Sequence, residues 1–303
     1  MYRFILVMFL CTAHAFGQAL IITEENDAFT GSDNDYSQGL EITYEQQVDR
    51  AKNNKPYRIS WGAKNLIYTP TVLSNPFPQP GDRPWGGITM VTRTKTTQTS
   101  RTIENEYISV GASGDWSFSD VIQTEWHALL GITEPLGWDN QIANEIVANY
   151  KRHYIKPLAE AGNRKETSAD IAAAYGFVVG TANVNSEAGL YGRAGWNMPR
   201  QRLSLINTTS RTFKPSAFLF ARGRGTYHLH NIMINGSLFQ DGPERDLEHL
   251  VFDGQVGLSV GATGIGDTNT LLTYSYTYRT KEFRGQSNDV DFGTIELRVG
   301  KSF

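Results

Sequence analysis

One side chain able to do acid–base chemistry and an amide able to orient it lie one helical turn apart in the middle of the chain. Residues 119–131 carry apolar side chains at helical spacing, which predicts an amphipathic helix. Gln123 and His127 are four residues apart in this stretch, so their side chains share one face of the helix. A histidine can take a proton from water, and a neighbouring amide can orient the ring or the water. A surface or core histidine without a catalytic role would give the same pattern.

A second group of polar side chains lies near the N-terminus, where two predicted strands meet. Asn26 and Asp27 end the first strand, and Asp35 and Ser37 stand at the start of the second. The neighbouring ends of a hairpin bring these side chains to one rim. Their oxygen atoms suit a hard cation such as Ca²⁺, and Mg²⁺ and Mn²⁺ take similar ligands. Turn chemistry accounts for the same residue types without a metal.

A third candidate is Arg83, in the loop sequence Pro-Gly-Asp-Arg-Pro that follows the third predicted strand. Its guanidinium group could anchor a phosphate. The alternative is a salt bridge with the neighbouring Asp82 that locks the turn. The sequence leaves both roles open.

The elements that must position these residues are strands. Charged residues make up 19% of the chain and the formal charge is −3, so no basic surface for nucleic acid is indicated. The mean hydropathy of −0.37 is too polar for a helical membrane protein. It agrees with a β-barrel, whose polar interior balances its apolar outside.

The first fifteen residues read as a secretory signal peptide. They contain Arg3, a short apolar core and the small-residue cleavage site Ala13-His14-Ala15. A buried N-terminal strand is the alternative. Cleavage after Ala15 would remove Cys11, the only cysteine, and would leave residues 16–303 as an exported chain without a disulfide.

Residues 16–303 read as one domain of alternating strands. At the C-terminus, Ile295, Leu297 and Val299 alternate with Glu296 and Arg298. Small and polar residues on one face, with aliphatic residues and tyrosines on the other, suit a barrel in lipid; a soluble sandwich would bury its largest residues. We count about twelve segments, the even number that a single-chain barrel requires: 18–25, 36–48, 57–68, 85–96, 100–112, 145–157, 168–182, 186–197, 215–230, 248–263, 268–283 and 290–303.

The sequence therefore predicts an all-β fold, a transmembrane antiparallel β-barrel of about 12 strands with a short helix in an extracellular loop. The expected location is the outer membrane of a Gram-negative bacterium. The longer connections, residues 113–144, 198–214 and 231–247, are expected outside the cell. The terminal Phe303 resembles the signal by which the barrel assembly machinery recognises its clients, so this machinery is an expected partner.

Several motifs, taken in order, resemble the outer-membrane lipid A 3'-O-deacylases, the LpxR family. None is specific alone, and the resemblance rests on their order over roughly residues 19–145 of an exported barrel. The motifs are Asn26-Asp27, Asp35-Tyr36-Ser37-x-Gly39, Tyr68-Thr69-Pro70, Gly81-Asp82-Arg83, Gln123-x-x-x-His127 and Gly137-Trp138-Asp139-x-Gln141.

This resemblance implies an active site at the outer-leaflet end of the barrel, between its wall and a helix of an extracellular loop. It implies that His127 activates water with Gln123 beside it. It also implies that Asn26, Asp27 and Ser37 bind Ca²⁺ and stabilise the oxyanion. The substrate would be the 3'-linked acyl ester of lipid A in lipopolysaccharide, among the lipids of the outer membrane.

Two positions depart from the family pattern. Residues 71–80 contain no basic residue where the family has a Lys-Arg pair, which makes Arg83 the candidate for holding the substrate phosphate. The glutamate that follows the family's histidine falls on Thr133, with Glu134 next to it. These departures bear on the substrate more than on the chemistry.

Two other functions stay open. An outer-membrane phospholipase would use a serine nucleophile oriented by histidine and asparagine, but no serine lies near a histidine at a recognisable spacing, although such partners can be distant in sequence. A non-catalytic barrel, either a pore or a structural protein, would show the same polar interior and long loops. Such a barrel has no need of Gln123 and His127 facing a polar rim.

Overall fold

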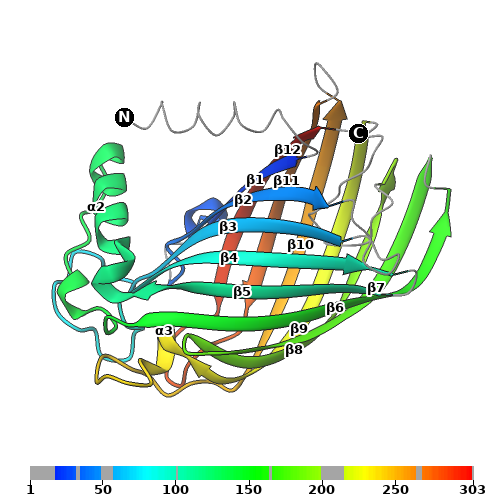
Figure 1. Ribbon diagram of the computed structural model, residues 1–303. Coiled ribbons are helices and arrows are strands. Elements are labelled where there is room, and N and C mark those ends of the chain that lie inside the picture. Colours follow the sequence, from blue (N-terminus) through cyan, green and yellow to red (C-terminus); the bar gives the residue numbers. More distant parts are fainter. Residues whose placement is uncertain are drawn as a thin grey trace.

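The chain forms a closed barrel of twelve antiparallel strands, in which each strand pairs with its neighbours in sequence and β1 pairs with β12 (Figure 1). The computed structural model describes residues 18–31, 35–48, 57–99, 102–163, 166–198, 215–263 and 268–301. The strands are β1 (Gln18–Asn26), β2 (Gln38–Val48), β3 (Tyr57–Tyr68), β4 (Gly86–Gln98), β5 (Ile103–Ser113), β6 (Ile146–Gly162), β7 (Thr167–Gly180), β8 (Asn183–Trp196), β9 (Ser216–Asn231), β10 (Leu250–Thr263), β11 (Thr268–Arg279) and β12 (Val290–Lys301). The predicted fold class is confirmed.

Alternation along the strands separates an apolar outside from a polar inside. On β10, Val256 and Leu258 are exposed whereas Gln255 and Ser259 are buried. The same pattern holds on β12, where Ile295 is exposed and Glu296 is buried. A closed barrel pairs every strand edge, which satisfies the backbone hydrogen bonds in a medium without water.

One end of the barrel carries the helices and most of the long connections. Barrels of this type have short periplasmic turns and longer extracellular loops, so this end is the extracellular one. The helices there are η1 (Asp27–Thr30), η3 (Gly114–Ser117), α2 (Ser119–Leu130), η4 (Trp138–Asn140) and α3 (Ile232–Asn235). In the part of the chain that the structure describes, no helix is both long and apolar enough to cross a membrane.

The prediction that residues 198–214 form an external loop is wrong. Trp196 ends β8 and Ser216 begins β9 at the end of the barrel opposite to α2 (Figure 1). Successive antiparallel strands reverse direction, so the eighth strand returns to the periplasmic end. Residues 199–214 themselves lie outside the described residues, as do the predicted signal peptide, residues 1–15, and Phe303.

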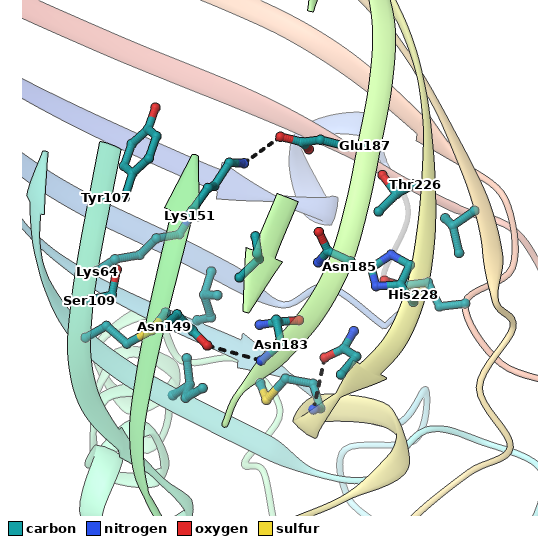
Figure 2. A pocket seen from close by; sticks show the side chains of 18 of the residues that line it. Lys64, Tyr107, Ser109, Asn149, Lys151, Asn183, Asn185, Glu187, Thr226 and His228 are labelled. Carbon is teal, nitrogen blue, oxygen red and sulfur yellow. Dashed lines mark hydrogen bonds and ion pairs between the residues drawn. The ribbon is translucent and has the colours of Figure 1, made fainter. Parts of the chain in front are cut away.

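Charged side chains of alternating sign form a continuous chain of ion pairs through the barrel interior. All of its members except Arg83 line a cavity of about 400 Å³, and Figure 2 shows Lys151 of β6 reaching Glu187 of β8 across it. The pairs are Lys151–Glu187 (2.7 Å), Glu187–Arg224 (3.0 Å), Arg224–Asp253, Asp253–Arg279 (2.7 Å), Arg279–Glu282 (3.3 Å) and Glu282–Arg83 (3.5 Å). This ion-pair chain ends at Arg83, in the extracellular connection between β3 and β4.

Candidate active site

The predicted rim residues come together at the extracellular ends of β1 and β2. The backbone N–H of Asp27 donates to the carbonyl oxygen of Tyr36 at 3.2 Å. The side-chain amide of Asn26 donates to the carbonyl oxygen of Ser37 at 2.5 Å. The Ser37 hydroxyl lies 2.6 Å from that of Thr69, at the end of β3. Thr69, which the sequence did not single out as a ligand, therefore belongs to this rim.

The oxygen donors at the rim fit a hard cation in kind. Asp27, which is 3% exposed, supplies a carboxylate. Ser37 and Thr69 supply hydroxyls. Asn26 differs, because its side-chain oxygen already accepts the backbone N–H of Ala28 at 2.8 Å and caps η1. Within the described ranges, no group of three His, Cys, Asp or Glu side chains is placed to hold a metal ion. Carboxylate, hydroxyl and carbonyl oxygens would have to supply the ligands.

Asp35 lies in the turn that precedes Ser37 and is held there by contacts with other connections. Its backbone has a φ of 66°, in the left-handed region that Asp tolerates better than most residues. Arg83 donates to its carbonyl oxygen at 3.1 Å, and Gln286 donates to its carboxylate at 2.6 Å. Burial raises the pKa of the Asp35 carboxyl above its ordinary value, although Arg83 and Gln286 act in the opposite direction. The turn next to Ser37 is thus held by partners from two other connections.

Arg83 is buried in this support. The residue is 1% exposed, pairs with Glu282 at 3.5 Å and lies 4.0 Å from the centre of the Tyr68 ring. Asp82 is not its ion-pair partner, because the Asp82 carboxylate accepts the backbone N–H groups of Thr71 and Arg83. The structure therefore gives the guanidinium three contacts within the protein, and phosphate binding by Arg83 stays a prediction.

Helix α2 is attached to the barrel by its first turns. Its N-cap is Phe118, which has a left-handed φ of 57°, and it ends at Leu130 with Gly131 as its C-cap, close to the end of the predicted stretch 119–131. The Ser119 hydroxyl accepts a hydrogen bond from Asn65 of β3 at 2.8 Å. A Cβ on Gly87 of β4 would lie 2.2 Å from that of Ser119, so this close approach requires glycine. The rest of the helix stands clear of the rim (Figure 1).

Gln123 is the helix residue that packs against the rim. It is 2% exposed, and its side-chain oxygen accepts the indole N–H of Trp138 at 3.0 Å. The indole N–H can only donate, so the oxygen must face Trp138 and the amide nitrogen must point the other way. That nitrogen is buried without a hydrogen-bond partner among the described residues. Gln123 thus offers a free donor.

Trp138 was missed as a site residue, although it lies in one of the motifs. Its ring is 5.3 Å from that of Trp85, and both pack with Ile67 near the end of β3. Ile67 is paired with Gln38, the residue after Ser37. The Gln123 amide is therefore tied through packed side chains to the rim that carries Ser37.

His127 lies one turn further along α2 and is half-buried. Its Nδ1 contacts the backbone carbonyl oxygen of Thr133. A carbonyl can only accept, so Nδ1 carries the proton and Nε2 of the neutral ring keeps its lone pair. Thr133 is the position where the family pattern has a glutamate, and here its main-chain oxygen contacts the ring.

A family model described as outer membrane protein LpxR matches residues 3–300, nearly the whole chain. The chain belongs to the LpxR family. The solved structure of LpxR from Salmonella typhimurium superposes with a TM-score of 0.75 at 18% identity, covering 92% of this chain and 99% of that chain. The beta domain of the Bordetella autotransporter BrkA gives a TM-score of 0.50 at 11% identity, covering 95% of this chain and 99% of that chain. No curated protein matches the sequence.

Membership of the LpxR family, together with the barrel, makes this an outer-membrane protein. At 18% identity the likeness to LpxR from Salmonella shows the fold. Family membership supports the coarse prediction of a lipid A deacylase. The metal, the reaction steps and the roles of individual residues remain to be argued from the geometry.

Proposed function

We propose that this member of the LpxR family is an ester hydrolase that removes the 3'-linked acyl group of lipid A. The observation that carries the chemistry is the His127–Thr133 contact, because it leaves Nε2 of His127 able to take a proton. The helix that carries His127 stands at the extracellular end of the barrel, where lipid A is exposed in the outer leaflet. Family membership favours this substrate over other esters.

The reaction needs a base, a donor for the oxyanion and a proton for the leaving group. Nε2 of His127 would take a proton from water, whose oxygen attacks the ester carbonyl carbon. The free amide nitrogen of Gln123 would donate to the oxyanion that forms. As the C–O bond breaks, His127 would return its proton to the sugar 3'-oxygen. The products are a free fatty acid and a 3'-hydroxyl group.

Calcium is the proposed cofactor, with Asp27, Ser37 and Thr69 as the residues whose oxygens would hold it. Asn26, predicted as a ligand, would brace this site by capping η1 and holding Ser37. When bound there, Ca²⁺ supplies positive charge that polarises the ester carbonyl. The same oxygen donors would accept Mg²⁺ less readily, because Mg²⁺ demands a stricter octahedral geometry.

Mass spectrometry of lipid A tests the substrate. Cells that express the protein should yield lipid A lighter by the 3'-linked acyl substituent, and cells without it should not. Release of fatty acids from phospholipids with unchanged lipid A would instead indicate a phospholipase. Ion conductance in planar bilayers without hydrolysis of any lipid would indicate a pore. Assembly by the barrel assembly machinery, expected from Phe303, is tested by depleting that machinery.

Removal of calcium is expected to lower deacylation by at least about 100-fold, since the loss of charge stabilisation at a developing oxyanion costs roughly that much. Purified protein would be assayed in a calcium chelator, and Ca²⁺ would then be restored. Asp27→Asn should raise the Ca²⁺ concentration that gives half-maximal activity, while the barrel keeps its shift in electrophoretic mobility on heating. Full activity in the chelator would remove calcium from the mechanism.

Trp138→Phe is expected to lower kcat about 10-fold and leave KM nearly unchanged, a loss of about 1.4 kcal/mol that is within the range of one hydrogen bond. Phenylalanine keeps the packing against Trp85 but cannot donate to Gln123, so the amide is free to turn its oxygen towards the oxyanion. Trp116→Phe, on an exposed tryptophan of η3, is the matched control. An unchanged kcat in Trp138→Phe would show that Gln123 is not positioned in this way.

A further inference from the structure

Helix α2 presents apolar side chains that the described chain leaves uncovered. Only Ser119 and Gln123 of its twelve residues are buried. Leu129 is 74% exposed, and Phe118, which precedes the helix, is 66% exposed. The exposed apolar residues of α2 are Val121, Ile122, Trp126, Leu129 and Leu130, with Trp116 and Phe118 before them and Ile132 and Leu136 after them. A contiguous apolar patch of this kind marks an interaction surface.

Three of the exposed apolar residues form a stripe, and the exposed Glu125 lies at its edge. Ile122, Trp126 and Leu129 follow one another at spacings of four and three, so their side chains lie on one side of α2. Thr124 lies on the opposite side, about 180° away from this stripe at 100° per residue. An apolar stripe with a polar face behind it is the pattern of a helix that lies in a membrane interface.

The stripe continues the lipid-facing surface of the barrel. Ile146, the first residue of β6, is 65% exposed and pairs with Ala112 of β5. Val110 and Ile108 extend the same outer face down β5. Lipid-facing side chains therefore reach the strand ends from which η3 and α2 begin, and Trp116 in η3 lies between the two surfaces along the chain.

We propose that the exposed face of α2 is embedded in the acyl chains of the outer leaflet. The occupant is lipid hydrocarbon, because the stripe adjoins a surface that lipid already covers. In addition, Trp126 in the stripe and Trp116 before the helix are of the type enriched at membrane interfaces. A second protein copy would have to cover a helix that projects from the rim (Figure 1). The helix that carries His127 is thus held by the barrel at its first turns and by lipid along its length.

Spin labels test this placement without any measurement of activity. Leu129→Cys and Thr124→Cys would be made in a Cys11→Ser background, labelled with a nitroxide and folded into vesicles of phosphatidylethanolamine and phosphatidylglycerol. At Leu129, oxygen should relax the label severalfold more than a water-soluble nickel chelate does, and at Thr124 the order should reverse. Each variant must first show the heat-dependent mobility shift of a folded barrel.

Two results would overturn the proposal. Equal access of the nickel chelate to both labels would place the stripe in water. A Leu129 label shielded from both reagents, with dipolar broadening from a neighbouring label, would place it against a second copy of the chain. Because the measurement needs no substrate, an inactive protein could still give the lipid result, and an active one could still fail it.

Discussion

Replacing His127 with alanine is expected to lower the rate of lipid A deacylation by about 10²–10⁴-fold, the usual contribution of a general base. The stability of the barrel should not change, because His127 is half-buried on a helix that is not part of the barrel wall and its ring contacts the Thr133 carbonyl. Loss of the base removes proton transfer from the attacking water, while substrate binding at the rim remains. The expected change is therefore in kcat rather than in KM.

The measurement is mass spectrometry of lipid A from cells that express the wild type or His127→Ala at equal levels on the surface. His249→Ala is a matched control, since this histidine also lies at the extracellular end and contacts a backbone carbonyl, that of His228. The control should deacylate like the wild type. A fully active His127→Ala variant would assign the base to another group and contradict the mechanism.

Replacing Arg83 with methionine is expected to lower the free energy of unfolding by about 3–5 kcal/mol, the range measured when one partner of a buried ion pair is removed. Methionine fills the space but leaves Glu282 without one of its two arginine partners. It also leaves the Asp35 carbonyl oxygen with the Thr69 backbone N–H as its one remaining donor among those described. The turn that carries Asp35 should loosen with it. Activity should also fall, because Ser37, a proposed calcium ligand, lies two residues after Asp35 in this turn.

Urea titration of the barrel in lipid vesicles, followed by tryptophan fluorescence, gives the free energy. Arg284→Met is the control, because Arg284 belongs to the same connection as Glu282 but is exposed. Adding Glu282→Gln to Arg83→Met should restore part of the loss. An Arg83 variant with normal unfolding and a raised KM for phosphorylated lipid A would contradict the bracing role and support phosphate binding.

The strands could be predicted from the sequence because their signal is local. The alternation of Gln255 and Ser259 with Val256 and Leu258 indicates, within a few residues, both that the segment is a strand and which of its sides faces lipid. The helix end at Gly131 is local in the same way. The error at residues 198–214 arose because loop length was used to assign the side of the membrane, whereas the number of preceding strands decides it.

The contacts within the candidate site could not be predicted, because they depend on closure of the barrel. Gln286 and Asp35 are 251 positions apart and meet because β12 pairs with β1. The same closure brings Glu282 to Arg83. The contact between Trp138 and Gln123 depends on the path of the loop between α2 and η4. This loop has no hydrophobic periodicity from which its path could be predicted.

The ion-pair chain in the barrel interior has a consequence for how this interior can change during evolution. Apart from its ends, each member lies between two charges of the opposite sign, as Glu187 does between Lys151 and Arg224. Loss of one charge leaves its neighbours unbalanced in a buried setting, which costs several kcal/mol. Substitutions at these positions should therefore be inherited in compensating sets, so that relatives differ by whole neutralised segments rather than by single interior charges.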